Sequence, residues 1–173
     1  MDDRMLTGLL ERLAQGDRAA FEALYIEINK PVYTVLLRIT RDGGLAEDLL
    51  QEFFVRLFRS PPVPPPRSPR AYLFQMARNL AIDGIKSQPR HGDIDDYTHI
   101  PDRSQTEGID RLDLERAFAA LSSGDRQIVA LHLNAGLKFR EIAAMLDRPL
   151  GTVLWRYRQA IGKLRSLLDG GTV

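Results

Sequence analysis

Hydrophobic residues recur at intervals of three and four along most of the chain, the spacing that gathers side chains on one face of an α-helix. In the first half of the chain this pattern predicts four helices, at about 6–14, 17–39, 45–58 and 70–87. The side chains expected to be buried in the last three of them are Phe21, Leu24, Tyr25, Ile28, Leu49, Leu50, Phe53, Phe54, Leu57, Leu73, Met76, Ala77, Leu80 and Ile85.

Turn and cap residues set the expected ends of these helices. Asp17 and Ser68 are side chains of the type that caps a helix N-terminus, and Ser68 is followed by a proline, which is favoured at the first helical position. Pro31 is expected to interrupt the second helix, and Gly43 and Gly44 to break the chain before the third.

A second, smaller helical block is expected in residues 111–173, with helices at about 112–121, 125–133, 139–146 and 152–168. Its last two helices have the spacing of a helix-turn-helix motif, in which small Ala143 lets the helices approach and Leu146 and Val153 share their core. The second helix of such a motif is the recognition helix. No useful length of strand alternation is present, so the predicted fold is all-α, with two small helical domains.

The segment 88–110 separates the two blocks. It is polar, contains two prolines and two glycines, and shows no hydrophobic period, so we expect a flexible linker between domains at 1–87 and 111–173. The linker carries a net charge of −4 and residues 111–173 a net charge of +4, within a total of only +1. This uneven distribution indicates a polyanionic partner.

Composition excludes several kinds of chemistry. The 173 residues include no cysteine, which excludes disulfides, thiolate metal sites and a cysteine nucleophile. The three histidines, His91, His99 and His132, are scattered and form no metal-ligand or catalytic spacing. We therefore expect no enzyme activity, no catalytic or metal-binding residues, no cofactor and no small-molecule substrate. No apolar run is long enough for membrane insertion and no signal-peptide pattern is present, so a cytoplasmic protein is expected.

Two basic zones are candidate nucleic-acid surfaces. The recognition-helix region carries Arg148, Arg156, Arg158, Lys163 and Arg165, with no acidic residue from Arg148 to Leu168. Such a bias suits contact with phosphates, although a solvated helix face would show it too.

The second zone surrounds residues 60–69, of which six are proline. Its cations outnumber its acids, and aromatic Tyr72 and Phe74 lie among them. Basic charge with partly exposed aromatic rings is typical of surfaces that bind single-stranded DNA, since bases stack on the rings. The alternative for both rings is a place in the core.

Specific motifs strengthen the nucleic-acid interpretation. Residues 46–58 (AEDLLQEFFVRLF) resemble the region 2 signature of bacterial RNA polymerase sigma factors, and residues 71–83 (AYLFQMARNLAID) are similar to its downstream half. Residues 139–143 (FREIA) and 149–153 (PLGTV) resemble region 4. Both motifs, in this order and in a chain of this length, resemble the small extracytoplasmic-function (ECF) type.

The resemblance implies a function and a set of contact residues. Core RNA polymerase would be bound by Asp48, Gln51, Glu52 and Arg56. The −10 promoter element would be melted and held by Arg59, Arg67, Arg70, Tyr72, Phe74, Arg78 and Asn79. The −35 element would be recognised by Arg148, Thr152, Leu154, Trp155, Arg156, Arg158 and Gln159. The acidic linker would follow the RNA-exit path, and an anti-sigma factor is an expected further partner.

Three residues depart from the family pattern. Leu154 and Trp155 stand where the family usually has a basic residue and a small hydroxyl residue, and Asp147 stands where a glycine is usual before the turn. Two alternatives therefore stay open: a helix-turn-helix regulator that does not engage polymerase, and a sigma-derived protein-interaction module.

Overall fold

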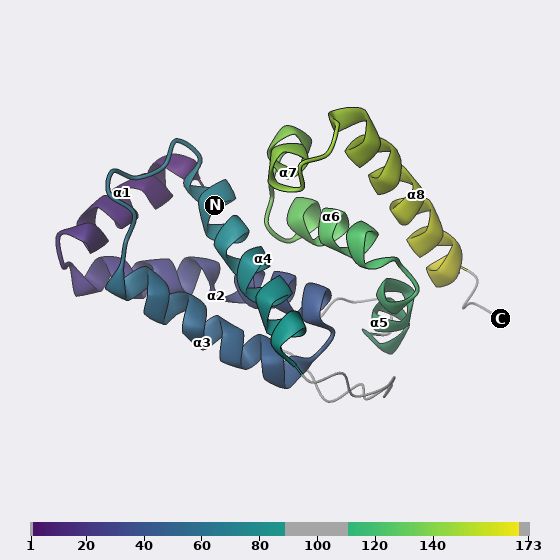
Figure 1. The fold of residues 1–173 in the computed structure, drawn as a ribbon, viewed down its shortest axis with the longest axis horizontal. Coiled ribbons are helices and arrows are strands. Elements are labelled where there is room, and N and C mark those ends of the chain that lie inside the picture. Colours follow the sequence, from purple (N-terminus) through teal and green to yellow (C-terminus); the bar gives the residue numbers. More distant parts are fainter. Residues whose placement is uncertain (1, 89–110, 170–173) are drawn as a thin grey trace. The chain divides into compact units, whose positions relative to one another are not determined.

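The computed structural model describes residues 2–88 and 111–169, which belong to two compact units. All regular structure in these ranges is α-helical, which confirms the predicted fold class. The first unit contains α1 (Asp3–Ala14), α2 (Arg18–Thr40), α3 (Gly43–Arg59) and α4 (Pro69–Ser87). The second contains α5 (Arg111–Ala119), α6 (Ser123–Leu133), α7 (Phe139–Met145) and α8 (Leu150–Asp169) (Figure 1). The predicted linker at 88–110 lies almost wholly outside the described residues.

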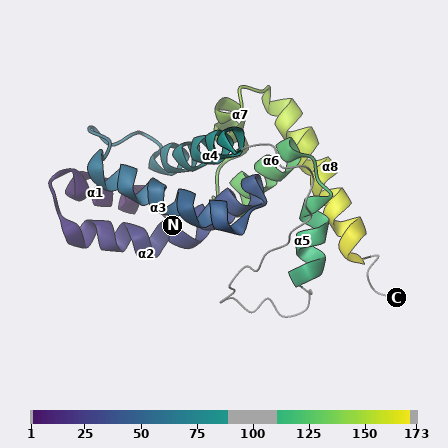
Figure 2. The same cartoon turned by 60° about the horizontal axis from the view of Figure 1, so that its bottom comes forward.

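In the first unit, α2 packs along both α3 and α4, and α1 covers α2 (Figures 1 and 2). The core is filled by large apolar side chains from all four helices, with full burial of Leu6, Leu10, Leu24, Ile28, Leu36, Phe53, Leu73 and Phe74. Gly84 allows close packing where α4 meets α3, because a Cβ there would lie 3.0 Å from Cδ1 of Leu49. Burial of these side chains is the main stabilising contribution to the unit.

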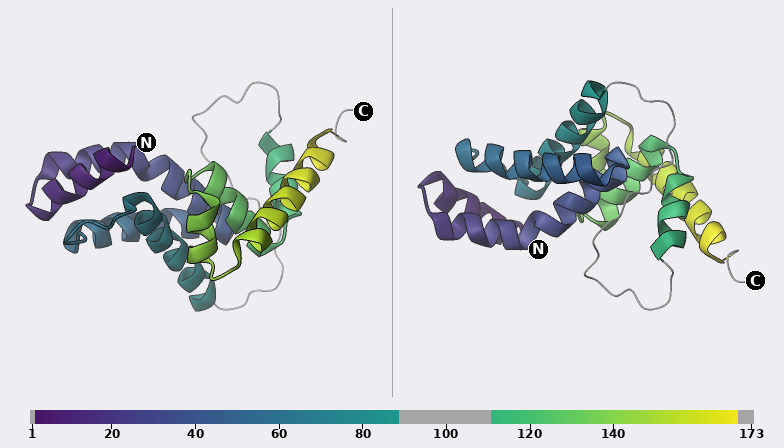
Figure 3. Two further views of the ribbon diagram at one scale, coloured as in Figure 1. Left: turned by 90° about the horizontal axis from the view of Figure 1, so that it is seen from above. Right: turned by 90° about the horizontal axis from the view of Figure 1, so that it is seen from below.

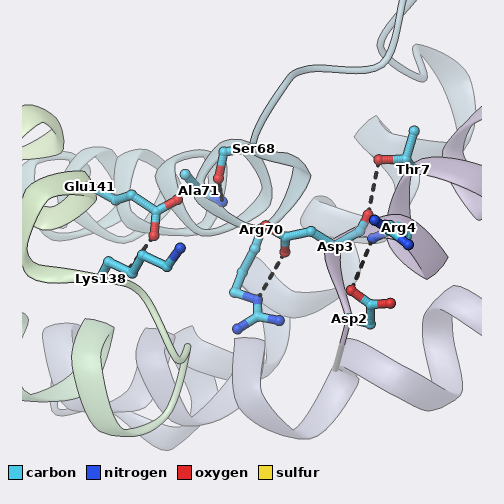
Figure 4. A network of polar contacts seen from close by, with 9 residues as sticks. All are labelled: Asp2, Asp3, Arg4, Thr7, Ser68, Arg70, Ala71, Lys138 and Glu141. Atoms are coloured by element: carbon cyan, nitrogen blue, oxygen red, sulfur yellow. Dashed lines mark hydrogen bonds and ion pairs between the residues drawn. The ribbon is translucent and has the colours of Figure 1, made fainter.

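Side-chain caps fix where the helices of this unit begin. The predicted caps are confirmed: Asp17 accepts the backbone N–H of Ala19 at 2.9 Å, and Ser68 accepts that of Ala71 at 3.4 Å (Figure 4). The Arg12 guanidinium, which donates to Asp17, holds the pKa of that carboxyl below its ordinary value, so the cap stays ionised. Asp42 also caps, because its Oδ1 accepts the N–H of Leu45 at 2.9 Å.

Some predicted boundaries and burials are wrong. Because Asp42 supplies the cap, Gly43 and Gly44 form the first turn of α3 rather than a break. Pro31 lies inside one continuous helix from Arg18 to Thr40, since the buried side chains on both sides of it hold the helix against α3 and α4.

Five predicted core positions are not fully buried either, and two of them, Phe21 and Met76, are half-buried. Tyr25 is 46% exposed and packs its ring on Phe54 at a centroid distance of 4.7 Å. Ile85, in the last turn of α4, is 42% exposed. Leu50 is half-buried, at the edge of the inward face of α3.

The second unit is built around α8. Its core cluster joins α5, α6 and α8, and Figure 3 shows α5 and α8 side by side. The cluster consists of Ala117, Phe118, Leu121, Val129, Ala160 and Leu164. The helix-turn-helix prediction is confirmed in its geometry: α7 and α8 are joined by a short turn, and Ala143 and Val153 are buried between them while Leu146 is half-buried. Ser122 caps α6, which therefore begins at Ser123, two residues before the predicted start.

None of the helices in the described parts of the chain is both long and apolar enough to cross a membrane.

Candidate functional site

The outer side of α3 presents the predicted polar group. Asp48, Gln51, Glu52 and Arg56 are all exposed, at steps of three and four residues that keep them on one side of the helix. Glu52 and Arg56 form an ion pair one turn apart. Leu49, Phe53 and Leu57 occupy the opposite, buried side. We call this outer side, residues 48, 51, 52, 55, 56 and 58, the α3 face.

An apolar centre in the α3 face was missed by sequence reasoning. Val55 is 46% exposed and Phe58 is 48% exposed. A shallow hollow of about 420 Å³ opens beside them, lined by Phe21, Phe54, Val55, Phe58 and Arg59. The Phe21 ring meets the Phe58 ring edge-on at 5.1 Å, which fixes the wall of the hollow. The signal that was available was Val55, an apolar residue among polar ones.

On α4, the structure separates two rings that the sequence placed together. Phe74 is fully buried, so the prediction that it is partly exposed to stack on DNA is wrong. Adjacent Leu73 is also buried, because α4 packs against three helices and its inward face is correspondingly wide. Tyr72 is half-buried, and Asn79, two turns further along, is exposed on the same side of the helix. Gln75 is exposed between them and was missed.

The basic residues around α4 differ in their surroundings. Arg59 and Arg67 are exposed. Arg70 lies with its Nε 3.3 Å from Oδ1 of Asp3, which ties α4 to the start of α1 (Figure 4). This contact gives Arg70 a partner within the unit, and its contact with DNA stays a prediction. Arg78 is half-buried, and desolvation lowers the pKa of its guanidinium, which nevertheless remains protonated near neutral pH.

The outward side of α8 brings together most of the residues predicted for −35 recognition. Thr152, Trp155 and Gln159 follow one another at steps of three and four and are exposed, as is Arg158 beside them. Leu154 is half-buried, and Arg148 is exposed in the turn before the helix. The opposite side of α8 is buried through Val153, Ala160 and Leu164. We call the outward side, residues 151, 152, 155, 158, 159 and 162, the α8 face.

Arg156 does not join this face. Its Nε donates to Oδ1 of Asp125 at 2.7 Å, and its Nη2 donates to Oγ of Ser122 at 3.1 Å, so it holds α8 to the start of α6. Gly124 makes this possible, because a Cβ at that position would lie 2.9 Å from Nη2 of Arg156. The structure therefore gives Arg156 a partner inside the unit, and its contact with DNA stays a prediction.

Backbone hydrogen bonds fix the turn that presents α8. The N–H of Arg148 donates to the carbonyl of Ala143 at 3.0 Å, and the N–H of Asp147 donates to that of Ala144 at 3.3 Å. These two bonds form a Schellman motif, which requires a left-handed residue at its centre. Asp147 adopts this conformation, with φ of +49°. The departure from the usual glycine therefore keeps the backbone shape that a glycine would give.

The start of α7 is fixed by its own first turn. The Glu141 carboxylate accepts the backbone N–H of Lys138 at 2.8 Å, which is one half of a capping box. Glu141 thus has a structural use within the FREIA motif.

His132 is used in packing. Its ring stacks on Phe139 at 4.1 Å and meets Tyr157 edge-on at 5.0 Å, while Nδ1 lies 2.9 Å from the carbonyl oxygen of Leu137. Among the residues that the structure describes, no three histidine or carboxylate side chains gather to hold a metal ion.

Comparison with known proteins identifies the class of protein to which this chain belongs. Residues 24–91 match the sigma-70 region 2 family, and residues 117–166 match the sigma-70 region 4 family. The first match includes α3 and α4, and the second includes the helix-turn-helix. The class defined by the fold and its faces is therefore that of sigma factors of the sigma-70 kind.

Full-length relatives narrow this class. The chain is 32% identical over 164 residues to the ECF RNA polymerase sigma factor SigL of Mycobacterium tuberculosis, covering 90% of this chain and 93% of that protein. It is 29% identical over 175 residues to the ECF RNA polymerase sigma factor SigK of Mycobacterium ulcerans, covering 95% and 94%. This chain belongs to the ECF RNA polymerase sigma factors, the family whose members bind core RNA polymerase and direct it to promoters.

Two solved structures share the fold. One is the sigma factor RpoE of Bartonella quintana in complex with the anti-sigma factor NepR, with a TM-score of 0.68, 19% identity, and coverage of 87% of this chain and 98% of that one. The other is CnrH in complex with the cytosolic domain of CnrY, with a TM-score of 0.69, 22% identity, and coverage of 97% and 99%.

Proposed function

We propose that this sigma factor divides its work among three faces: the α3 face binds core polymerase, the exposed side of α4 holds the opened −10 element, and the α8 face reads the −35 element. The observation that carries this proposal is that each face lies on a helix whose opposite side is core. The fold can therefore present each face to a partner without unfolding.

The α3 face has the anatomy of a protein interface. An apolar centre, Val55 and Phe58, lies within a polar border of Gln51, Glu52 and Arg56. Protein interfaces commonly combine a desolvated apolar core with a hydrated polar rim. The polar border alone would be a weak basis for binding, because an exposed ion pair contributes little.

Substitution of Val55 tests this assignment. Val55→Asp places a charge in the apolar centre, and because Val55 is exposed the fold should be unaffected. Ile85→Asp is the matched control, since Ile85 is a similarly exposed branched residue on α4. We expect Val55→Asp, and the pair Asp48→Ala with Glu52→Ala, to abolish co-purification with core polymerase, while Ile85→Asp retains it. Equal retention by Val55→Asp and Ile85→Asp would remove the α3 face from the proposal.

The exposed side of α4 suits a melted strand. Tyr72 offers a ring for stacking, and Gln75 and Asn79 offer amides that can donate and accept hydrogen bonds. Unpairing DNA costs a few kcal/mol per base, and capture of an extruded base offsets that cost.

Transcription with purified core enzyme separates this proposal from its alternatives. A helix-turn-helix regulator that does not engage polymerase would bind duplex DNA but would not co-purify with the core. A sigma-derived interaction module would bind protein and give no promoter-specific transcript from any template. We expect promoter-specific transcripts that depend on the chain.

We also propose regulation by an anti-sigma protein, because RpoE and CnrH, which share this fold, were each solved with a protein partner. Such a partner would compete with core polymerase for the chain. A purified candidate that binds the chain yet leaves its association with core enzyme unchanged would contradict this. We further propose that the chain works by binding alone, without catalysis of its own, and in the cytoplasm, where its polymerase partner acts.

A further inference from the structure

The centre of the α8 face is occupied by an apolar ring. Trp155 is 62% exposed and lies on the side of α8 opposite to Val153 and Ala160. Thr152 and Gln159 flank it along one edge, and Arg158 lies along the other. Exposed tryptophans commonly mark contact sites, and this indole lies at the middle of the α8 face.

The arginine next to Trp155 in the chain is bound inside the unit. Arg156 follows Trp155 directly, and its guanidinium is held by Asp125 and Ser122 at the start of α6. The centre of the face is thus left to the indole, while Arg158 remains exposed at its edge.

Two glycines leave space beside the indole. Gly151 precedes Trp155 by about one turn and Gly162 follows it by about two, so both lie on the α8 face. A Cβ at either position would meet nothing within 4 Å, so packing inside the unit does not require a glycine there. Glycine inside a helix lowers helix stability, as at Gly162, and a partner that approaches the helix closely on both sides of Trp155 would make use of the missing side chains.

The charge of the helix favours DNA over protein as that partner. No acidic residue occurs between Arg148 and Leu168, and Arg158 and Arg165 are exposed on the helix. Cations at this density attract the phosphates that border the major groove.

We propose that Trp155 reads the 5-methyl groups of thymines at the centre of the −35 element. This inference rests on the proposed function of the α8 face. In the major groove, thymine presents an apolar methyl group and an O4 acceptor. The indole offers an apolar ring and one N–H donor, so it suits both. It has no acceptor for the amino groups that adenine and cytosine present.

Half-buried Leu154 lies next to Trp155 on the Arg158 side and adds a second apolar surface.

Removal of single methyl groups tests the proposal with the unaltered protein. The −35 sequence is first selected by the holoenzyme, core polymerase with the full chain, from promoters with a randomised −35 region. Each selected thymine is then replaced by deoxyuridine, which lacks only the methyl group. We expect a thymine-containing element and a loss of about three- to fivefold in affinity at each position that Trp155 touches.

Variants assign the effect to Trp155. The Trp155→Ala holoenzyme should bind the thymine and deoxyuridine promoters equally well. Trp155→Arg should change the selected base at that position to guanine, because arginine pairs with O6 and N7 of guanine. Leu133→Ala is the matched control, since Leu133 is 55% exposed on α6, and it should keep the full deoxyuridine effect.

Fluorescence gives an independent readout, because Trp155 is the only tryptophan in the chain. Binding of the selected −35 duplex to the full chain should shield Trp155 from acrylamide quenching, and the deoxyuridine duplex should shield it less at equal occupancy.

The outcomes are distinguishable. If the wild-type holoenzyme binds the selected promoter but is insensitive to deoxyuridine, or if Trp155→Ala keeps the thymine preference, the thymine assignment is wrong while the function of the α8 face stands. If Trp155→Ala instead loses a protein partner and keeps its promoter affinity, Trp155 is a protein contact, which also overturns the proposal. If the holoenzyme selects no −35 sequence, the proposed function of the α8 face fails and this inference fails with it.

Discussion

At the scale of single residues, Asp147 shows how a departure from the family pattern can keep the same backbone. Its φ of +49° lies in the left-handed region, which aspartate tolerates better than β-branched residues do. We expect Asp147→Val to destabilise the second unit by roughly 1–2 kcal/mol, because a β-branched side chain is strained in this conformation. Asp147→Gly should keep most of the stability. Urea denaturation of the two variants measures the difference, and equal stability would mean that the turn is not held in this shape.

Two neighbouring arginines on α8 should behave differently. Arg158 is exposed on the α8 face, whereas Arg156 is bound to Asp125. Arg158→Ala should therefore reduce the slope of log binding constant against log salt by about one phosphate contact.

Arg156→Ala is the matched control and should leave that slope unchanged. It should instead lower the stability of the second unit by about 1 kcal/mol, the ordinary contribution of a hydrogen bond between charged groups that are partly exposed. Salt titrations of promoter binding measure the slopes. A reduced slope for Arg156→Ala and an unchanged slope for Arg158→Ala would reverse the assignment of the two residues.

At the scale of helices, α4 combines a core side with a binding side. Asn79 is exposed on α4, two turns from Tyr72. Asn79→Ala should leave the stability of the first unit almost unchanged and impair promoter opening more than the binding of duplex promoter. Permanganate reactivity of unpaired thymines measures opening, and filter binding measures the duplex complex. Equal loss in both measurements would exclude a role for Asn79 that is specific to the opened strand.

The helices themselves were largely predictable from the sequence. The burial of Leu49, Phe53 and Leu57 follows from the helical period alone, because their spacing places all three side chains on one side of α3. The helical period does not predict how wide the buried side of each helix is. Phe74 is buried because α4 packs against three helices, whereas Phe58 stays 48% exposed although its ring meets that of Phe21 on α2 edge-on at 5.1 Å.

The site was predictable where a residue acts by its position on one helix. The outward placement of Thr152, Gln159 and Arg158 follows from spacing. The partner of Arg156 is 31 residues away in the chain, so no local pattern reveals it. The ion pair of Arg70 with Asp3 is of the same kind. Sequence reasoning thus finds the faces but cannot tell which cations on or near them are used inside the fold.

At the scale of the whole molecule, the chain has two cores, each with its own hydrophobic cluster. Ile28 in the first unit and Ile128 in the second are both almost fully buried, which makes them a matched pair of probes. Replacing either by valine removes one methylene group and costs about 1 kcal/mol. For a domain of this size that loss lowers the melting temperature by about 4–8 °C.

If each core melts as its own cooperative unit, the two substitutions should act on different transitions. Scanning calorimetry of the full chain should show two transitions, with Ile28→Val lowering only one and Ile128→Val only the other. The double variant should show both shifts, because changes at sites that share no contacts add. A single transition lowered equally by both substitutions would mean that the two units fold as one. In that case a destabilising substitution in the unit proposed to recognise the −35 element would also lower the stability of the unit proposed to bind polymerase. The three faces could then not be altered one at a time.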